Sequence, residues 1–184
     1  MAAATVRSRW SCGAKVQGRR LAAVLILVAA TVHAQADTAR VEDEAAGLFA
    51  QSCVPFAGDR SGLRQWIADH HLPALSPGGQ AAFLHGQPGT AYDATSPAGK
   101  FVLIAGEDGS CSVISQRAGA DALLAAFTRD MQTLGLAVQK TGEHADPAPP
   151  ALRWIDYVAS FGRRGWSLTI GTGDGPAMLT ARPR

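Results

Sequence analysis

Three histidines lie close together in the sequence and are the first residues that could hold a metal ion. His70 and His71 are adjacent, and His85 follows further along the chain. Adjacent side chains of a helix point in different directions, so His70 and His71 cannot both bind one ion while the helix stays wound. The sequence has no His-x-x-x-His spacing either. We therefore predict no metal site, no cofactor and a structural position for His70 at a helix end.

Cys53 is the residue that could act as a nucleophile, with His70 as a base and Asp59 as the group that orients it. The residues around Cys53 match no protease signature. After residue 36 the chain contains two cysteines, Cys53 and Cys111. A pair of this kind in an oxidising compartment favours a disulfide, which would stabilise the fold by roughly 4 kcal/mol in the chain-entropy model. We predict the disulfide and no catalytic residue.

The glycine-rich stretch 171–175 is a candidate phosphate-binding loop by composition alone. It lacks the Lys-Ser/Thr pair of such loops, and Pro176 leads into another strand pattern rather than into a helix. The stretch is more typical of a hairpin turn.

Arginines and tryptophans close to the carboxyl end form the candidate binding site that the sequence suggests. Arg163 and Arg164 are adjacent, and Trp154 and Trp166 flank them. Aromatic side chains beside arginine can bind an acidic ligand or a glycan and are common at the centres of interfaces. The alternative is a charged turn that connects strands whose aromatic residues lie in the core.

Residues 1–36 have the pattern of a signal peptide. Five basic residues precede the apolar run 21–30. Val32-His33-Ala34 and Ala34-Gln35-Ala36 both offer cleavage sites, the second of them before Asp37. An uncleaved anchor and a twin-arginine signal at Arg19-Arg20 are the alternatives. We expect cleavage, a single domain over residues 37–184, no stable membrane span after cleavage, and a periplasmic or secreted location.

The charge of the chain changes when this segment is removed. Of the 17 Lys and Arg residues, five lie within residues 1–36, where no Asp or Glu occurs. The remaining chain has 12 basic and 15 acidic residues, a net charge of about −3. The basic isoelectric point of the whole chain is therefore no indication of a nucleic-acid partner.

The middle of the chain predicts a hairpin followed by an amphipathic helix. The apolar run 101–104 is rich in strand formers, and the turn residues 107–109 lead into an alternating strand that carries Cys111. From Asp121, a candidate N-cap, apolar residues recur every three or four positions until Gly135 ends the helix.

Further helices are expected before this hairpin and further strands after the helix. Helical patterns cover 42–53, start again at Asp59 and again at Ser76, whereas Gly, Pro, Ser and Thr make 85–100 mostly loop, in which only residues 90–93 look extended. Strand patterns with a period of two follow between residues 136 and 181. We predict an α+β fold: an antiparallel sheet of about five or six strands, with the N-terminal helices and the central amphipathic helix packed on one face.

No set of acid, base and nucleophile emerges from these patterns. The leading hypothesis is a non-catalytic binding or interaction module of the cell envelope, whose partner is an envelope protein or a small ligand. One alternative is a hydrolase-type enzyme whose site is formed by Asp59, His70 and His85, which would have to converge in one cleft. Another is an inhibitor or immunity-type protein.

Overall fold

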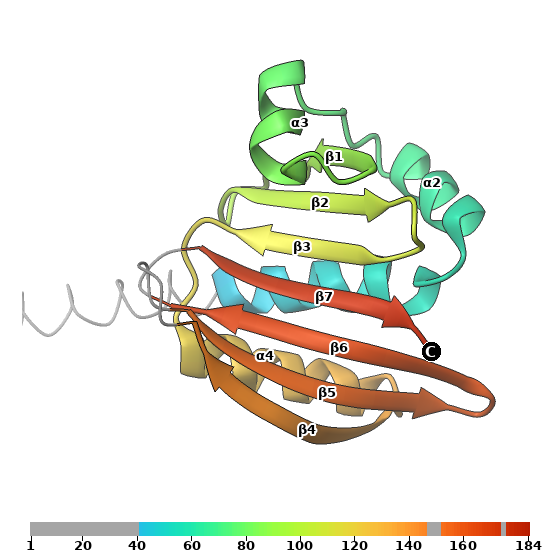
Figure 1. The fold of residues 1–184 in the computed structure, drawn as a ribbon, viewed down its shortest axis with the longest axis vertical. Helices are drawn as coiled ribbons and strands as arrows, with labels where there is room; N and C mark the ends of the chain where they lie inside the picture. Colours follow the sequence, from blue (N-terminus) through green and yellow to red (C-terminus); the bar gives the residue numbers. More distant parts are fainter. Residues whose placement is uncertain (1–40, 147–151, 174–175) are drawn as a thin grey trace, which may run out of the picture. The chain divides into compact units, whose positions relative to one another are not determined.

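The structure is a computed structural model and describes residues 41–146, 152–173 and 176–184. The predicted signal peptide lies outside the described residues. The first helix covers residues 41–56. The later helices and the strands, labelled in Figure 1, are α2 (Arg60–Asp69), α3 (Pro77–Leu84), β1 (Gly89–Asp93), β2 (Phe101–Gly106), β3 (Cys111–Ser115), α4 (Ala120–Thr133), β4 (Ala137–Ala145), β5 (Arg153–Phe161), β6 (Arg164–Thr172) and β7 (Ala177–Pro183).

The described strands form one antiparallel sheet in the order β1-β2-β3-β7-β6-β5-β4 (Figure 1). The α+β class is confirmed, but the expected five or six strands are wrong, because the sheet has seven. The missed strand is β1, which lies in the segment 85–100 that was expected to be mostly loop. Its Thr90 and Tyr92 favour a strand but Gly89 and Asp93 do not, and pairing with β2 over Gly89–Asp93 supplies what local propensity does not.

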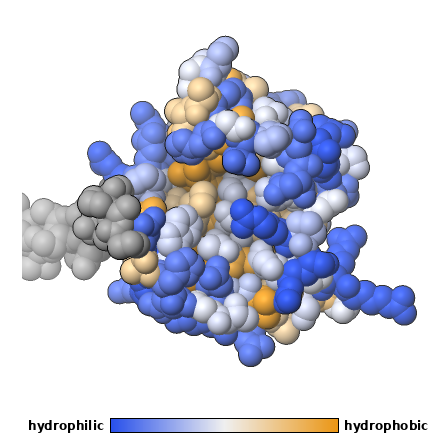
Figure 2. Space-filling model, in the orientation of Figure 1, coloured by the Kyte–Doolittle hydropathy of each residue, from blue (hydrophilic) through white to orange (hydrophobic). Residues whose placement is uncertain are grey.

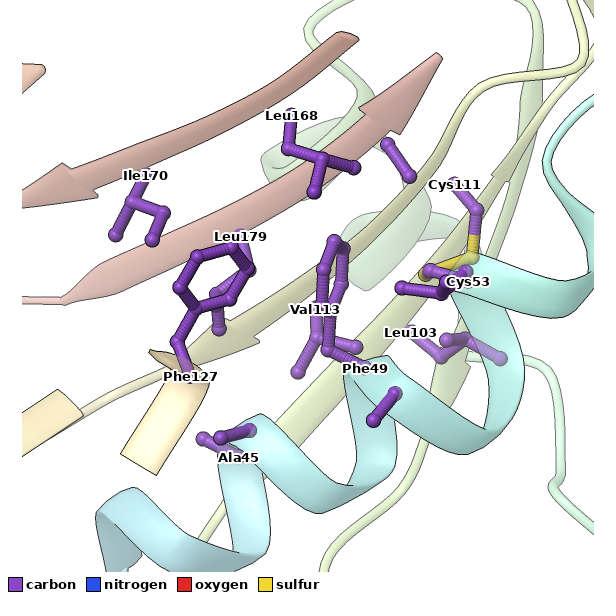
Figure 3. Packing of buried hydrophobic residues seen from close by; sticks show 14 of the residues in the cluster. Ala45, Phe49, Cys53, Leu103, Cys111, Val113, Phe127, Leu168, Ile170 and Leu179 are labelled. Atoms are coloured by element: carbon purple, nitrogen blue, oxygen red, sulfur yellow. A yellow bond between two sulfur atoms is a disulfide. The ribbon is translucent and has the colours of Figure 1, made fainter. Parts of the chain in front are cut away.

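One face of the sheet carries the hydrophobic core. The first helix and α4 lie behind the strands in Figure 1, and α2 packs at the same face near β1 and β2, where Leu63 lies beside Tyr92 and Ala105. In Figure 3 the first helix directs Phe49 towards the sheet, and the ring of Phe127 from α4 lies 6.3 Å from the ring of Phe49. The period-two pattern of the strands therefore buries one side of each central strand, as predicted.

A disulfide joins this helical layer to the sheet. Cys53, from the first helix, is bonded to Cys111 at the start of β3, with Cα atoms 5.0 Å apart, and neither residue is exposed (Figure 3). The predicted disulfide is confirmed. The two cysteines are 58 positions apart in the sequence, so the bond closes a long loop and strongly restricts the conformations of the unfolded chain.

The prediction that all helices pack on one face of the sheet is wrong for α3, which lies towards the other face. Ser76 caps it through a hydrogen bond from the Gly79 N–H, with Pro77 in the first turn, as the sequence indicates. However, none of its residues is buried, and it packs beside β1 with Ala82 and Phe83 directed to the other face of the sheet. A helix with so weak an apolar stripe has no face that must enter the core.

The α4 helix also starts differently from the prediction. The expected cap at Asp121 is wrong, because the N-cap is Gly119, whose backbone N–H donates to the buried carboxylate of Glu42 in the first helix. The C-terminal end is confirmed: Gly135 has a φ of +69°, and the Leu136 N–H donates to the Met131 carbonyl at 3.0 Å. At the start of α4, a side chain from a distant part of the sequence, Glu42, therefore accepts the hydrogen bond at the helix end, and Asp121 does not act as the cap.

The two edges of the sheet are built in different ways. At β1, the Gln80 amide accepts from the Ala91 N–H and donates to the Ala91 carbonyl, both at 2.8 Å, and Asp93 N–H donates to Pro73. At β4, which pairs with β5 alone among the described strands, the register shifts between Lys140 and Gly142. A side chain therefore covers one edge, and a bulge disrupts the other.

Within the described residues, no helix combines the length and the apolar character that crossing a membrane requires.

Candidate functional site

The face of the sheet opposite the core is the open face, and it is not uniformly polar. Side chains at Ile104 of β2, Ile114 of β3 and Met178 of β7 alternate with the buried residues of their strands and are partly exposed. Figure 2 looks onto this face and shows hydrophobic residues gathered in a hollow below α3. A continuous apolar run such as 101–104 supplies side chains to both faces of a sheet, which is why this one leaves apolar surface outside the core.

These residues line a cleft of about 700 Å³, which we call the open-face cleft. Its floor comes from β2, β3, β6 and β7, and its roof comes from α3 through Ala82 and Phe83. The volume falls within the roughly 300–1,000 Å³ that is typical of small-molecule pockets, which are lined by apolar groups with a few polar ones. The complete lining is Ala82, Phe83, His85, Ile104, Ile114, Gln116, Leu152, Trp154, Gly171, Pro176, Ala177 and Met178.

Trp154 forms one end of the open-face cleft, and Gly171 makes its position possible. The two residues are directly opposite on β5 and β6. A Cβ atom placed on Gly171 would lie only 2.4 Å from the tryptophan ring, so the indole lies directly against the glycine backbone. Because Gly171 has no side chain, the large indole has room to lie against the strand on the open face.

Three polar side chains in the lining have no partner in the part of the chain that the structure describes. The imidazole of His85, the amide of Gln116 and the indole N–H of Trp154 make no hydrogen bond to other described residues. His85 follows α3 with a φ of +47°, an uncommon conformation for a residue with a side chain. All three groups can donate hydrogen bonds to a bound molecule.

A polar cluster lies beside the apolar part of the open face. The Thr169 hydroxyl donates to the Asp156 carboxylate at 2.9 Å, and His144 Nδ1 lies 3.6 Å from the other oxygen of the same carboxylate. His144 is directly opposite Trp154 on the neighbouring strand. In a catalytic triad the hydroxyl donates to the histidine, which in turn contacts the carboxylate. Here the Thr169 hydroxyl donates directly to the Asp156 carboxylate, so the histidine is not placed to activate it as a nucleophile.

The structure does not bring together the four residues of the predicted aromatic-basic patch. Trp166 is 5% exposed and belongs to the core, whereas Arg163 and Arg164 lie at the exposed turn between β5 and β6. Trp154 is near the other end of β5, roughly 24 Å along the strand from Phe161, where the turn begins, at about 3.4 Å per residue. Of the predicted binding residues, only Trp154 lies in the open-face cleft.

The residues of the enzymatic alternative are also separated. Asp59 caps the N-terminus of α2, where the Gly62 backbone N–H lowers the pKa of its carboxyl, whereas His70 is the residue that caps the other end of this helix. The Nδ1 atom of His70 lies 2.8 Å from the Trp66 carbonyl, and its ring stacks on the Trp66 indole. His85 lies in the open-face cleft, which neither of the others lines. These three side chains therefore share no cleft.

No group of three or more His, Cys, Asp or Glu side chains arranged to hold a metal ion occurs in residues 41–146, 152–173 and 176–184.

Sequence reasoning missed the open-face cleft because its residues come from separate elements. The signal that could have found Trp154 and Gly171 is the hairpin register: the strands end at Phe161 and start again at Arg164, which aligns the two residues across the ladder. The longer turn expected over 162–165 shifts this alignment by two residues.

Comparisons with protein-family models, with curated proteins and with solved structures find no match for this chain.

Proposed function

We propose that this chain is an exported, non-catalytic binding module and that the open-face cleft receives a small apolar ligand. The observation that carries the proposal is the cleft itself: about 700 Å³ of space between α3 and the sheet, lined mainly by apolar side chains. Soluble proteins that leave apolar surface in a concave site use it for binding.

The separation of the candidate catalytic residues supports a binding function over an enzymatic one. Asp59 and His70 lie at opposite ends of α2, and His85 lies beyond another helix. Within the described residues, the cleft is not lined by any cysteine, serine, aspartate or glutamate. His85 is the one candidate general base in the described lining, and nucleophilic catalysis would need a cysteine, serine or carboxylate within reach of the bound molecule as well.

The disulfide supports the proposed export to the periplasm or the medium. Stable disulfides persist in oxidising compartments and are rare in the cytosol of most organisms. Mass spectrometry of protein recovered from its native location tests this part of the proposal. The expected species begins at Asp37 and has Cys53 bonded to Cys111; a chain with both thiols free and an intact amino terminus contradicts it.

The binding proposal is tested with N-phenyl-1-naphthylamine, a neutral probe whose fluorescence rises in apolar surroundings. Ile114→Lys places a charge in the cleft, and we expect at least a tenfold loss of probe affinity. Val158→Lys is the matched control, since Val158 is a partly exposed β-branched residue on the open face that does not line the cleft. We expect no change for this control.

Met178→Lys repeats the test from β7 in case Ile114→Lys does not fold. Circular dichroism and thermal unfolding establish that each variant is folded. Equal probe affinity in the wild type and in both cleft variants would contradict the proposal, because the probe would then bind elsewhere.

A further inference from the structure

We propose that the ligand of the open-face cleft is an apolar carboxylate, a molecule with a hydrocarbon body and one anionic end. This inference rests on the proposed binding function and adds the chemical class of the ligand. It follows from two features of the lining: a hydrocarbon floor and a set of unpartnered hydrogen-bond donors without any acidic side chain.

The floor of the cleft selects for a hydrocarbon body. Ile104, Ile114 and Met178 occupy neighbouring positions of β2, β3 and β7, because Ile114 pairs with Met178 in the β3–β7 ladder. Phe83 faces them from α3. These side chains present methyl, methylene and aromatic groups, which gain free energy from burial against apolar atoms and offer no hydrogen bond.

The polar groups of the cleft can donate hydrogen bonds to an acceptor at the end of that body, the exposed His85 and Gln116 side chains from the rim and the partly buried Trp154 indole from one end. His85, Gln116 and the indole N–H of Trp154 all lack partners among the described residues, and the indole can only donate. A carboxylate accepts several hydrogen bonds at once, and bonds that involve a charged group are the strongest of their kind. The lining is therefore complementary to a carboxylate.

Among the described residues, no acidic side chain lines the cleft where a cationic ligand would need one. The cleft itself has no Asp or Glu in its described lining, and His85 is its one titratable residue. The nearest acidic residue along β5 is Asp156, whose two oxygens already face the Thr169 hydroxyl and the His144 ring. An alkylammonium end would consequently find no carboxylate in the described lining to balance its charge.

A matched set of three molecules tests the ligand class: decanoate, decan-1-ol and decylamine, each below its micelle concentration and measured by displacement of N-phenyl-1-naphthylamine. We expect decanoate to bind at least tenfold more tightly than decylamine and more tightly than decan-1-ol. Affinity should rise about fourfold for each methylene between octanoate and decanoate, since a buried CH₂ contributes about 0.8 kcal/mol.

The outcomes separate this inference from the proposed function. If decylamine or decan-1-ol binds as tightly as decanoate, the carboxylate assignment is overturned and the apolar cleft stands. If none of the three displaces the probe while the probe itself binds in the cleft, the carboxylate assignment is likewise overturned. If the probe does not bind at all, the proposed function fails with it.

A pair of histidine variants locates the carboxylate. His85→Ala should lower decanoate affinity at least fivefold and change decan-1-ol affinity less than twofold. His71→Ala is the matched control, because His71 is also exposed and also has a positive φ, +54° against +47° for His85, but lies outside the cleft. It should change neither affinity. Equal losses for decanoate and decan-1-ol in His85→Ala would show that the imidazole only fills space, which overturns its assigned role.

Trp154→Phe provides a second measurement at the other end of the cleft. The substitution removes the indole N–H and keeps an aromatic ring against Gly171. We expect the preference for decanoate over decan-1-ol to fall while the affinity for decan-1-ol stays within twofold. An unchanged preference in both Trp154→Phe and Gln116→Ala would overturn the donor arrangement proposed here.

Discussion

The two faces of the sheet use the same strands for different purposes. On the core face, side chains such as Leu103, Val113 and Leu179 are fully buried under the first helix, α2 and α4. On the open face, their neighbours Ile104, Ile114 and Met178 remain partly exposed under α3 alone. Both faces of the sheet thus carry apolar side chains, but only the core face is covered by helices that bury them. The core face therefore stabilises the fold, and the partial exposure of the open face is the basis of the binding function that we propose.

The largest expected effect comes from truncating matched phenylalanines on the two faces. Phe49→Ala removes a fully buried ring that packs near Phe127, and we expect a loss of about 3–5 kcal/mol in the free energy of unfolding. Phe83→Ala removes a partly exposed ring from α3, and we expect a loss below about 1 kcal/mol together with weaker probe binding. Urea denaturation and probe titration measure both quantities. Similar stability losses for the two variants would remove the distinction between the faces.

Removal of the disulfide affects the core face in a different way. Cys53→Ala together with Cys111→Ala should lower the free energy of unfolding by about 2–5 kcal/mol, since the constraint on the unfolded chain is lost. Alanine is preferable to serine here because both cysteines are fully buried and a hydroxyl would lack a partner. Probe affinity under native conditions should be unchanged, because neither cysteine lines the cleft. A loss of probe affinity in the folded variant would contradict this expectation and would show that the cleft depends on the disulfide of the core face.

The core face could be predicted from the sequence to a far greater extent than the open face. The periodicity of α4, the N-cap at Asp59 and the pairing of Cys53 with Cys111 are local or near-unique patterns, and all three features are present in the structure. A period of two identifies buried strands whichever elements cover them.

The cleft and the pairing of the first strand could not be predicted, because they depend on long-range arrangement, although residues 90–93 already looked extended in the sequence. The β1 strand is stabilised by the Gln80 amide across a helix, and α4 is capped by Glu42, which lies in a different helix. Trp154 and Trp166 look equivalent as sequence, yet one lies on the open face and the other lies in the core, because an even separation preserves the face only within one strand. A tryptophan's role in this chain is therefore set by its register rather than by its neighbours in sequence.

Gln80 offers an intermediate test that concerns the edge next to the cleft. Gln80→Ala removes both side-chain hydrogen bonds to the Ala91 backbone, and we expect a loss of about 1–3 kcal/mol, because the Ala91 N–H loses its partner while the Ala91 carbonyl keeps the hydrogen bond from the Leu75 N–H. Probe affinity should also fall, since Gln80 holds α3, the roof of the cleft, against β1. Gln65→Ala, on the exposed side of α2, is the control and should change neither quantity. Normal stability in Gln80→Ala, measured by urea denaturation, would contradict this role of the amide.

The smallest expected effect on stability comes from Glu143 on β4, the edge strand opposite β1, which lies outside both the core and the open-face cleft. Arg153 and Lys140 lower the pKa of Glu143 from 4.5 to about 2. Because this carboxylate has a lower pKa in the folded state, its small contribution to stability is present above pH 4.5 and is lost as the pH falls towards 2. All three side chains are exposed, so solvent screens the pair and Glu143→Gln should change stability only slightly at pH 7. Thermal unfolding from pH 7 to pH 3 should show a shallower acid dependence in this variant than in the wild type. A large loss at neutral pH would mean that the β4 edge, like the core face, is essential to the fold.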